Sequence, residues 1–586
     1  MKKTVTKTRL TAYIVLTLIL AERAYTGAVD HKRYAGGKAE MKKTLGILIV
    51  CALMVLTACS GNNEKTNNGG TSGGNSNGAG TVSEPADPYA PMSETVTIEI
   101  GKEAAVDPKL PDGSTIEDNE LTRYFGEKLN IKYTNAWQAT TSGDAYMQKV
   151  GLTLSTGDIP DVMTVDKQQL VQLVNADLIE DLSSTYESFV SPALKAAYDS
   201  TDGYSLASAT FDGKLMAFPN VSPGADAQNL LWVRQDWLDE LGLEAPKTMD
   251  DIINVTKAFM DKKGSAGLLG NQVIVNIGTS VFGFDSIFSA YNAYPQLWVE
   301  DASGNAAYGS IQPEVKDALA KLRGWVEEGL IDKEFAVKKS EQVNELVVSG
   351  KAGIFFGPWW LPFGMLADSV AQDSKAEWVS YLSPLSQEGK MNTHMGSPTT
   401  RYLVVKKGFK HPEAVLKTLN MQFDADQLQG EGIVEKDDFN WMNMPFSLLV
   451  SNYDDKEKKA KLVQDVIDGN AAADTLQGEA KQIYNSYLKD KENPKKDLAA
   501  WSQRHAFLTG ALPLGKDDQI NRKVGVYYDQ TDTMRTKWAN LRKLEDETFL
   551  KIIMGNEPLD SFDGFVDKWK SQGGDQITEE IAAAAK

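Results

Sequence analysis

The sequence predicts an α/β protein with more than one domain. Strand-like segments, such as TVTIEI at 95–100, alternate along the chain with amphipathic helical segments, such as 314–331. This order is typical of layered α/β folds. The 586 residues are too many for one simple core and suggest two to four domains. Hydrophobic residues make up 42% of the chain, which is enough to fill cores of that size.

The first elements follow from local patterns. After the strand at 95–100, LNIKYT (129–134) predicts a second strand, and a helix is expected from about 145 through 154. STGDIPDVMTVD (155–166) predicts a turn, a strand and a loop, and the next segment, QLVQLVNADLIEDL, predicts a helix. Asp212-Gly213 lies between two apolar segments, which is the signal of a β-hairpin.

The later elements continue the alternation. Residues 230–243 predict a strand that runs into a helix, and Thr248 and Asp251 have the spacing of a capping box at the start of the next helix. A buried strand is expected to end at Gly357-Pro358. Residues 401–423 predict a strand, a turn at Gly408 and a helix from Pro412. From about Asp517 the chain is expected to be mostly helical.

The N-terminal region has a three-part pattern. Lys42 and Lys43 precede an apolar run, 45–56, that is too short to span a membrane, and Leu-Thr-Ala-Cys59 closes it. The pattern resembles a bacterial lipoprotein signal at 41–58. The resemblance implies cleavage before Cys59, lipidation of its thiol and anchoring on the outer face of the cell membrane. The alternative is an ordinary apolar segment that ends in cysteine by chance.

Two flanking segments complete this region. Residues 59–91 begin with the lipidated Cys and continue as a Gly/Asn/Ser-rich stretch that predicts a flexible tether. Nothing should precede the charged start of a signal peptide, so 1–40 is expected to be a mis-assigned upstream extension, with Met41 as the true start. The alternative is that Leu10–Ala21 is an additional apolar segment with its own function.

Composition excludes several classes of function. The formal net charge is −19, and no Lys/Arg cluster lies outside the extreme N-terminus, which argues against nucleic acid and against direct docking on anionic lipid. Both cysteines, Cys51 and Cys59, lie in the N-terminal region, and the four histidines are scattered. A disulfide framework, thiol catalysis, a cysteine-based zinc site and a histidine metal cluster are therefore not expected. No cofactor is expected.

Six segments in order carry a family resemblance. They are STGDIPDVM (155–163), DGKLMAFP (212–219), VRQDWLDELGLEAPKTMDD (233–251), EEGLIDKEFA (327–336), SGKAGIFFGPWW (349–360) and TFLKIIMGNEPLDSFDGFVDKWKSQGGDQI (548–577). Together they resemble extracellular solute-binding proteins of family 1, the carbohydrate type, and within it the large lipoprotein subgroup of Gram-positive bacteria.

The resemblance implies a class II periplasmic-binding-protein-like fold, in which two α/β lobes joined by a hinge enclose a ligand cleft. Lobe 1 is expected at 92–230, lobe 2 at 231–399, and the lobe 1 return with extra C-terminal helices at 400–586. Hinge closure would trap a carbohydrate, expected to be an oligosaccharide. A monomer would then deliver it to the permease subunits of an ABC importer, whose ATPase lies on the cytoplasmic side.

Sugars present flat C–H faces and rings of hydroxyls, which suit aromatic and polar side chains respectively. Family members place the first Trp of a G-P-W segment against sugar, which favours Trp359; Trp360 would lie on the opposite face of the strand. For each candidate the alternative is core packing, a helix cap or a surface role. The expected ligand-binding residues are Trp359, Trp137, Asp166, Gln168, Tyr291, Trp298, Trp360, Arg401 and Trp441.

One departure from the family concerns metal. Many members of the subgroup carry a calcium loop at the place where this chain reads AFMDKKGSAGLLGNQ (258–272). The segment lacks the alternating carboxylates that a hard cation needs, so no calcium is expected there.

Other functions stay open at this stage. A surface glycoside hydrolase would need two positioned carboxylates, and no motif selects a pair among the 80 acidic residues. A structural or adhesive lipoprotein would explain the anchor but not the six ordered segments. A binder of a non-sugar solute, such as a peptide, would share the same fold.

Overall fold

The computed structural model describes residues 87–584, apart from 107, 109, 142–144, 271–280, 425–427, 429–431 and 434–439. The described residues belong to one compact unit, 83–586. The predicted extension at 1–40, the signal at 41–58, Cys59 and all of the tether before residue 87 lie outside the described residues. Among the described residues, no helix is both long and apolar enough to cross a membrane.

One sheet of the compact unit has five strands, in the order β2-β1-β3-β13-β6. β1 runs parallel to β2 and β3, whereas β13 lies antiparallel between β3 and β6. Every residue of β3 and of β13 is buried, which is why both strands are rich in apolar residues instead of alternating with polar ones. The strands are β1 (Val96–Ala104), β2 (Ile131–Thr140), β3 (Val162–Val165), β6 (Phe218–Pro219) and β13 (Tyr402–Val405).

This sheet and its helices form the first core, which draws its buried residues from 96–221 and 402–450. The chain therefore leaves this core after β6 and returns to it at β13. The helices are α2 (Glu120–Leu129), α3 (Ala145–Thr156), α4 (Lys167–Asn175), α5 (Ser183–Phe189), α6 (Pro192–Asp199), α7 (Tyr204–Ser208) and α14 (Pro412–Phe423).

A second sheet has the antiparallel order β10-β7-β11, formed by Ile354–Gly357, Leu230–Arg234 and Trp378–Tyr381. Its side chains alternate between two apolar clusters. In β7, Leu231 and Val233 face one cluster, while Trp232 faces the other. This alternation follows from the two-residue period of a strand and shows that both faces of the sheet are covered.

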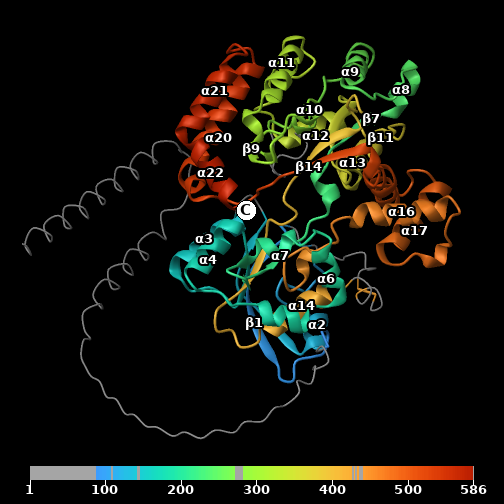
Figure 1. The fold of residues 1–586 in the computed structure, drawn as a ribbon. Helices are drawn as coiled ribbons and strands as arrows, with labels where there is room; N and C mark the ends of the chain where they lie inside the picture. Colours follow the sequence, from blue (N-terminus) through green and yellow to red (C-terminus); the bar gives the residue numbers. More distant parts are fainter. Residues whose placement is uncertain are drawn as a thin grey trace, which may run out of the picture. The chain divides into compact units, whose positions relative to one another are not determined.

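The cluster around Leu231 and Val233 is the second core, which draws its buried residues from 231–356 and 534–581. The last helices pack beside α11 and β9 (Figure 1). The elements are α8 (Gln235–Leu241), α9 (Met249–Lys263), α10 (Asp285–Ala290), β8 (Trp298–Glu300), β9 (Ala306–Tyr308), α11 (Pro313–Glu327), α20 (Asp532–Ile553), α21 (Ser561–Trp569) and α22 (Asp575–Ala584).

Further helices cover the other face of the second sheet. There Trp501 stacks on His505 and packs in the cluster that contains Trp232. Burial lowers the pKa of His505 to about 3, so this ring is a neutral part of the core. The helices on this face are α12 (Ser340–Val348), α13 (Met365–Gln372) and α18 (Leu498–His505). A separate apolar cluster, which contains Leu230 and Trp359, is formed with α16 (Asp455–Ile467), α17 (Gly478–Glu492) and α19 (Leu512–Leu514).

Two segments differ from the expectation. The region from Asp517 begins with a short 3₁₀ helix (Asp517–Gln519) and continues as a strand, β14 (Ile520–Val524), which pairs in parallel with β12 (Met391–Met395) before α20 starts. Residues 87–91 were assigned to the tether, yet Lys417 donates hydrogen bonds to the carbonyls of Asp87 and Ala90 at 3.0 and 2.7 Å. Buried donors need acceptors, and these carbonyls satisfy Lys417.

The turn and cap signals of the sequence are confirmed. Asp212 and Gly213 have φ of 49° and 76°, as a tight hairpin between β4 (Thr210–Phe211) and β5 (Lys214–Leu215) requires. Thr248 caps α9 in a capping box with Asp251. α14 begins at Pro412, as expected.

The stability of the second core is expected to depend on its C-terminal helices. Phe549 of α20 is fully buried and contacts the rings of Phe562 and Phe565. Phe549→Ala should therefore lower the free energy of unfolding by about 3–5 kcal/mol, measured by urea denaturation. Phe363→Ala is the matched control because Phe363 is 51% exposed, and it should cost less. Equal losses would mean that the C-terminal helices do not belong to this core.

Candidate functional site

Four strand ends of the first sheet meet at one edge. β1 ends at Ala104, β3 at Val165 and β6 at Pro219. Tyr402, the first residue of the antiparallel β13, pairs with both Val165 and Pro219. The residues that follow β1, β3 and β6, and those that precede β13, therefore share the carboxyl edge, where open α/β sheets bind ligands.

Asn220 joins two of the segments at this edge. Its side-chain Oδ1 accepts hydrogen bonds from the backbone N–H groups of Thr400 and Arg401, both at 2.8 Å. Its carbonyl accepts from the Thr399 hydroxyl at 2.8 Å, and its N–H donates to the Arg401 carbonyl at 2.9 Å. The segment that leaves the first core is thus fixed to the segment that returns.

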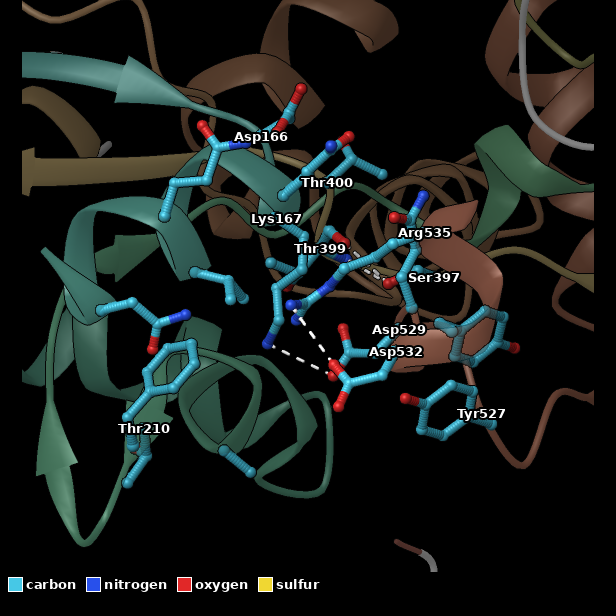
Figure 2. Close-up of a pocket in the computed structure, with 18 residues that line it drawn as sticks. Asp166, Lys167, Thr210, Ser397, Thr399, Thr400, Tyr527, Asp529, Asp532 and Arg535 are labelled. Carbon is cyan, nitrogen blue, oxygen red and sulfur yellow. Dashed lines mark hydrogen bonds and ion pairs between the residues drawn. The ribbon is translucent and has the colours of Figure 1, made fainter. Parts of the chain in front are cut away.

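A cavity of about 850 Å³ opens at this edge, within the ~300–1,000 Å³ range of small-molecule sites. One wall comes from the start of α4 and the hairpin region, a second from 397–400, and the opposite wall from 527–535 (Figure 2). The lining residues are Asp166, Lys167, Gln168, Val171, Gln172, Asn175, Ala207, Thr210, Phe211, Ser397, Thr399, Thr400, Tyr527, Tyr528, Asp529, Gln530, Asp532 and Arg535.

Lys167 bridges two walls of the cavity. Figure 2 shows its side chain reaching from the start of α4 toward Asp529, and its Nζ lies 3.3 Å from the Asp529 Oδ2. The same ammonium donates a hydrogen bond to the Ser208 carbonyl and lies 5.0 Å from the centroid of the Phe211 ring. This contact joins an element of the first core to the segment that leads into α20.

Two tyrosines form part of the opposite wall. The Tyr528 hydroxyl donates to the Met395 carbonyl and accepts from the Gly525 N–H, both at 2.7 Å. Its ring contacts that of Tyr204 edge to face, with centroids 5.7 Å apart. Burial raises the pKa of Tyr527 to about 12 and raises the pKa of Tyr528 as well, so both hydroxyls stay neutral at physiological pH.

Two of the predicted ligand-binding residues line the cavity. Asp166 follows β3 and caps α4, where its carboxylate accepts from the Gln169 N–H at 2.8 Å. The capping role that the sequence left open is therefore present, and it fixes where the carboxylate points. Gln168, on the first turn of α4, is exposed and leaves its amide available within the cavity.

Three predicted residues lie near the same edge but not in the lining. Arg401 is half-buried beside Thr400, and its positive charge opposes the rise that burial causes in the pKa of Glu103, at the end of β1. The expectation that Trp137 lies in a loop is wrong, because β2 continues through this residue to Thr140. Trp441 is 36% exposed in a short 3₁₀ helix whose Asn443 bonds the Pro108 carbonyl.

The two tryptophans after Gly357-Pro358 lie outside the strand. β10 ends at Gly357, so the expectation that strand alternation puts them on opposite faces is wrong. Trp359 is 5% exposed, and its indole N–H donates to Asp226 at 2.8 Å. Trp360 is half-buried and packs against two apolar clusters, one that contains Trp359 and one that contains Trp232.

The remaining two candidates pack with the second core. Trp298 is 4% exposed, and its ring lies 5.1 Å from that of Tyr308 and 6.2 Å from that of Trp569. Tyr291 follows α10 and is half-buried against the same core. A ligand role for these two side chains, and for Trp359 and Trp360, stays a prediction.

The sequence reasoning missed the wall formed by 527–535. Its segment YYDQTD (527–532) puts two aromatic rings beside four polar side chains that can form hydrogen bonds. Such a composition in a loop is a usable signal, but it lies far along the chain from Asp166, and the region was expected to be helical.

Wherever residues 87–584 are described, no three His, Cys, Asp or Glu side chains lie together as metal ligands. Of the segment 258–272, residues 258–263 form the end of α9 (Met249–Lys263), and Gly264 closes the helix with φ of 63°.

This chain is similar in sequence to several known proteins. The Bacillus subtilis polygalacturonan/rhamnogalacturonan-binding protein YtcQ is 25% identical over 384 residues, which are 64% of this chain and 71% of YtcQ. The Bacillus subtilis lipoprotein LipO is 22% identical over 491 residues, 81% of this chain and 89% of LipO.

A third relative has a solved structure. The Streptococcus pneumoniae fructooligosaccharide ABC transporter substrate-binding protein FusA is 27% identical over 289 residues, 45% of this chain and 50% of FusA. The structure of FusA in complex with kestose matches 83% of this chain and 98% of its own, with a TM-score of 0.55 and 15% identity. At that identity the match shows the fold, which is the two-lobe fold of binding proteins.

The family itself follows from the sequence. The sequence model of the family described as bacterial extracellular solute-binding protein matches residues 109–429, which is more than half of the chain. That range includes the ends of β3 and β6, the start of α4 and the returning segment 397–400. This chain belongs to the family of bacterial extracellular solute-binding proteins.

Proposed function

We propose that this protein captures a carbohydrate, most simply an oligosaccharide, in the cavity at the carboxyl edge of the first sheet. The observation that carries the proposal is the lining of that cavity. It combines hydroxyls, amides and carboxylates with the rings of Phe211, Tyr527 and Tyr528. Aromatic faces suit the C–H faces of sugars, and the polar groups suit their hydroxyls. The names of YtcQ and FusA, which specify saccharides, support the same class of ligand.

Capture would use a hinge. One wall, at 166–175 and 207–211, belongs to the first core, while 527–535 leads into α20 of the second core. A change in the angle between the cores would move these walls apart and open the cavity. A ligand that contacts both walls binds the closed form better than the open form, and it therefore shifts the population toward closure.

Asp166 and Gln168 are the proposed direct contacts from the first wall. Arg401, Trp137 and Trp441 extend the same edge and would contact a longer saccharide. The proposal also includes ligand contacts with Trp359, Trp360, Tyr291 and Trp298. These side chains are packed in the protein, so a ligand would reach them only if the surrounding packing shifts.

The protein would act as a lipid-anchored monomer outside the cell. Cys59 would carry the lipid, the tether would hold the compact unit near the membrane, and the closed form would dock on the permease of an ABC importer. The lipoprotein name of LipO supports the anchor. The proposal includes no catalytic step, so the saccharide leaves the protein unchanged.

Ligand binding is expected to raise thermal stability. The test uses the soluble body from residue 60, which contains the whole compact unit, with a panel of oligosaccharides and peptides. A saccharide at a hundred times its Kd should add about 2.7 kcal/mol to the free energy of unfolding. Chromatography afterwards should recover it intact. A shortened product would point to a glycoside hydrolase, and a response to peptides alone would contradict the carbohydrate proposal.

Gln168→Ala is expected to weaken saccharide binding about two- to twelvefold, because one neutral hydrogen bond contributes about 0.5–1.5 kcal/mol. Isothermal titration calorimetry measures the change. The matched control is Gln464→Ala, a glutamine on α16 outside the cavity lining, which should leave the Kd unchanged. If both variants change the Kd equally, Gln168 does not make a specific contact with the saccharide.

Cys59→Ser should release the full chain from membranes, since it removes the thiol that would carry the acyl chains. Fractionation of cells that express the variant, followed by immunoblotting, measures the distribution. Continued sedimentation of the variant with membranes would show that another segment holds the protein there.

A further inference from the structure

The charges that line the cavity are unequal in number. Asp166, Asp529 and Asp532 contribute three carboxylates, whereas Lys167 and Arg535 contribute two cations. In Figure 2 the two cations and the carboxylates of Asp529 and Asp532 converge in the middle of the cavity. A solute that enters this space therefore meets a small excess of negative charge.

Both cations already have carboxylate partners within the chain. Lys167 lies 3.3 Å from Asp529, donates to the Ser208 carbonyl and faces the Phe211 ring. Arg535 lies 3.3 Å from Asp532, which precedes it by one helical turn. An anionic ligand would have to compete with these fixed carboxylates, and it would lie close to them when bound.

The remaining place for an anion is also filled. A helix N-terminus attracts negative charge because its first N–H groups lack partners. α4 starts at the cavity, but the Asp166 carboxylate already accepts from the Gln169 N–H, and the Gln169 side chain accepts from the Asp166 N–H in return. The protein's own carboxylate thus accepts from one of the N–H groups that a ligand carboxylate would use, and it places a negative charge at this end of α4.

We propose that the cavity selects uncharged saccharides and rejects uronic-acid saccharides; this rests on the proposed function. Carboxylate oxygens and amides accept hydrogen bonds from sugar hydroxyls, whereas a uronate adds a carboxylate that, within the cavity lining, meets like charge and only cations already paired with carboxylates. The net charge of the chain, −19, acts in the same direction by slowing the approach of polyanions. The selectivity differs from what the name of YtcQ specifies for that protein.

The test compares saccharides that differ only at C6. Full chain in a detergent without a sugar headgroup is titrated with pairs matched in linkage and length: cellotriose with triglucuronate, and 1,4-galactotriose with trigalacturonate. Wherever a pair binds, the neutral member should bind at least tenfold more tightly. A uronate that binds as tightly as its neutral partner, or more tightly, overturns the selectivity and leaves the carbohydrate proposal intact. If none of these neutral and acidic saccharides binds, both the selectivity and the carbohydrate proposal are overturned.

A charge variant tests the cause. Asp529→Asn removes one carboxylate and frees Lys167, so it should improve uronate binding at least threefold relative to the neutral partner. The matched control is Asp517→Asn, whose carboxylate pairs with Arg522 outside the cavity lining and which should leave the ratio unchanged. An unchanged ratio in Asp529→Asn would show that the cavity charges do not set the preference.

Discussion

The tie between Asn220 and the backbone of Thr400 and Arg401 is the constraint on which the rest of the site depends. A chain that leaves one core and returns to it 180 residues later must bring both segments to the same sheet edge. The Asn220 amide does so by accepting two hydrogen bonds of 2.8 Å from the backbone N–H groups of these two residues. Because these segments are fixed to the first core, the orientation of 397–400 in the cavity is fixed as well.

Local features of the fold could be predicted from the sequence because their causes are local. The hairpin at Asp212-Gly213, the capping box of Thr248 and the helix from Pro412 each depend on residues within one or two turns. The pairing of β14 with β12 and the packing of α20–α22 in the second core depend on contacts between distant segments. Periodicity reports which face of an element is apolar, but not which element covers it.

Like the fold, the candidate site could be predicted from the sequence only where its causes are local. The place of Asp166 and Gln168 in the cavity lining could be predicted because they follow a recognisable strand, and strand ends are where α/β sheets bind ligands. The wall at 527–535 could not be assigned because nothing local relates it to β3. Tryptophans were harder still. Residue type does not distinguish a ring that stacks on sugar from one that packs on Tyr308 and Trp569, as Trp298 does.

The composition of the second core also sets the order in which the protein can fold. Phe288 and Phe549 are stacked with centroids 6.4 Å apart, yet roughly 260 residues separate them, which take about 13–50 s to synthesise. The first core likewise waits for β13 and for 444–450. Neither core can close on a short N-terminal fragment, because the first needs residues up to 450 and the second needs residues up to 581. A chain that must cross a membrane before it folds is helped by this delay.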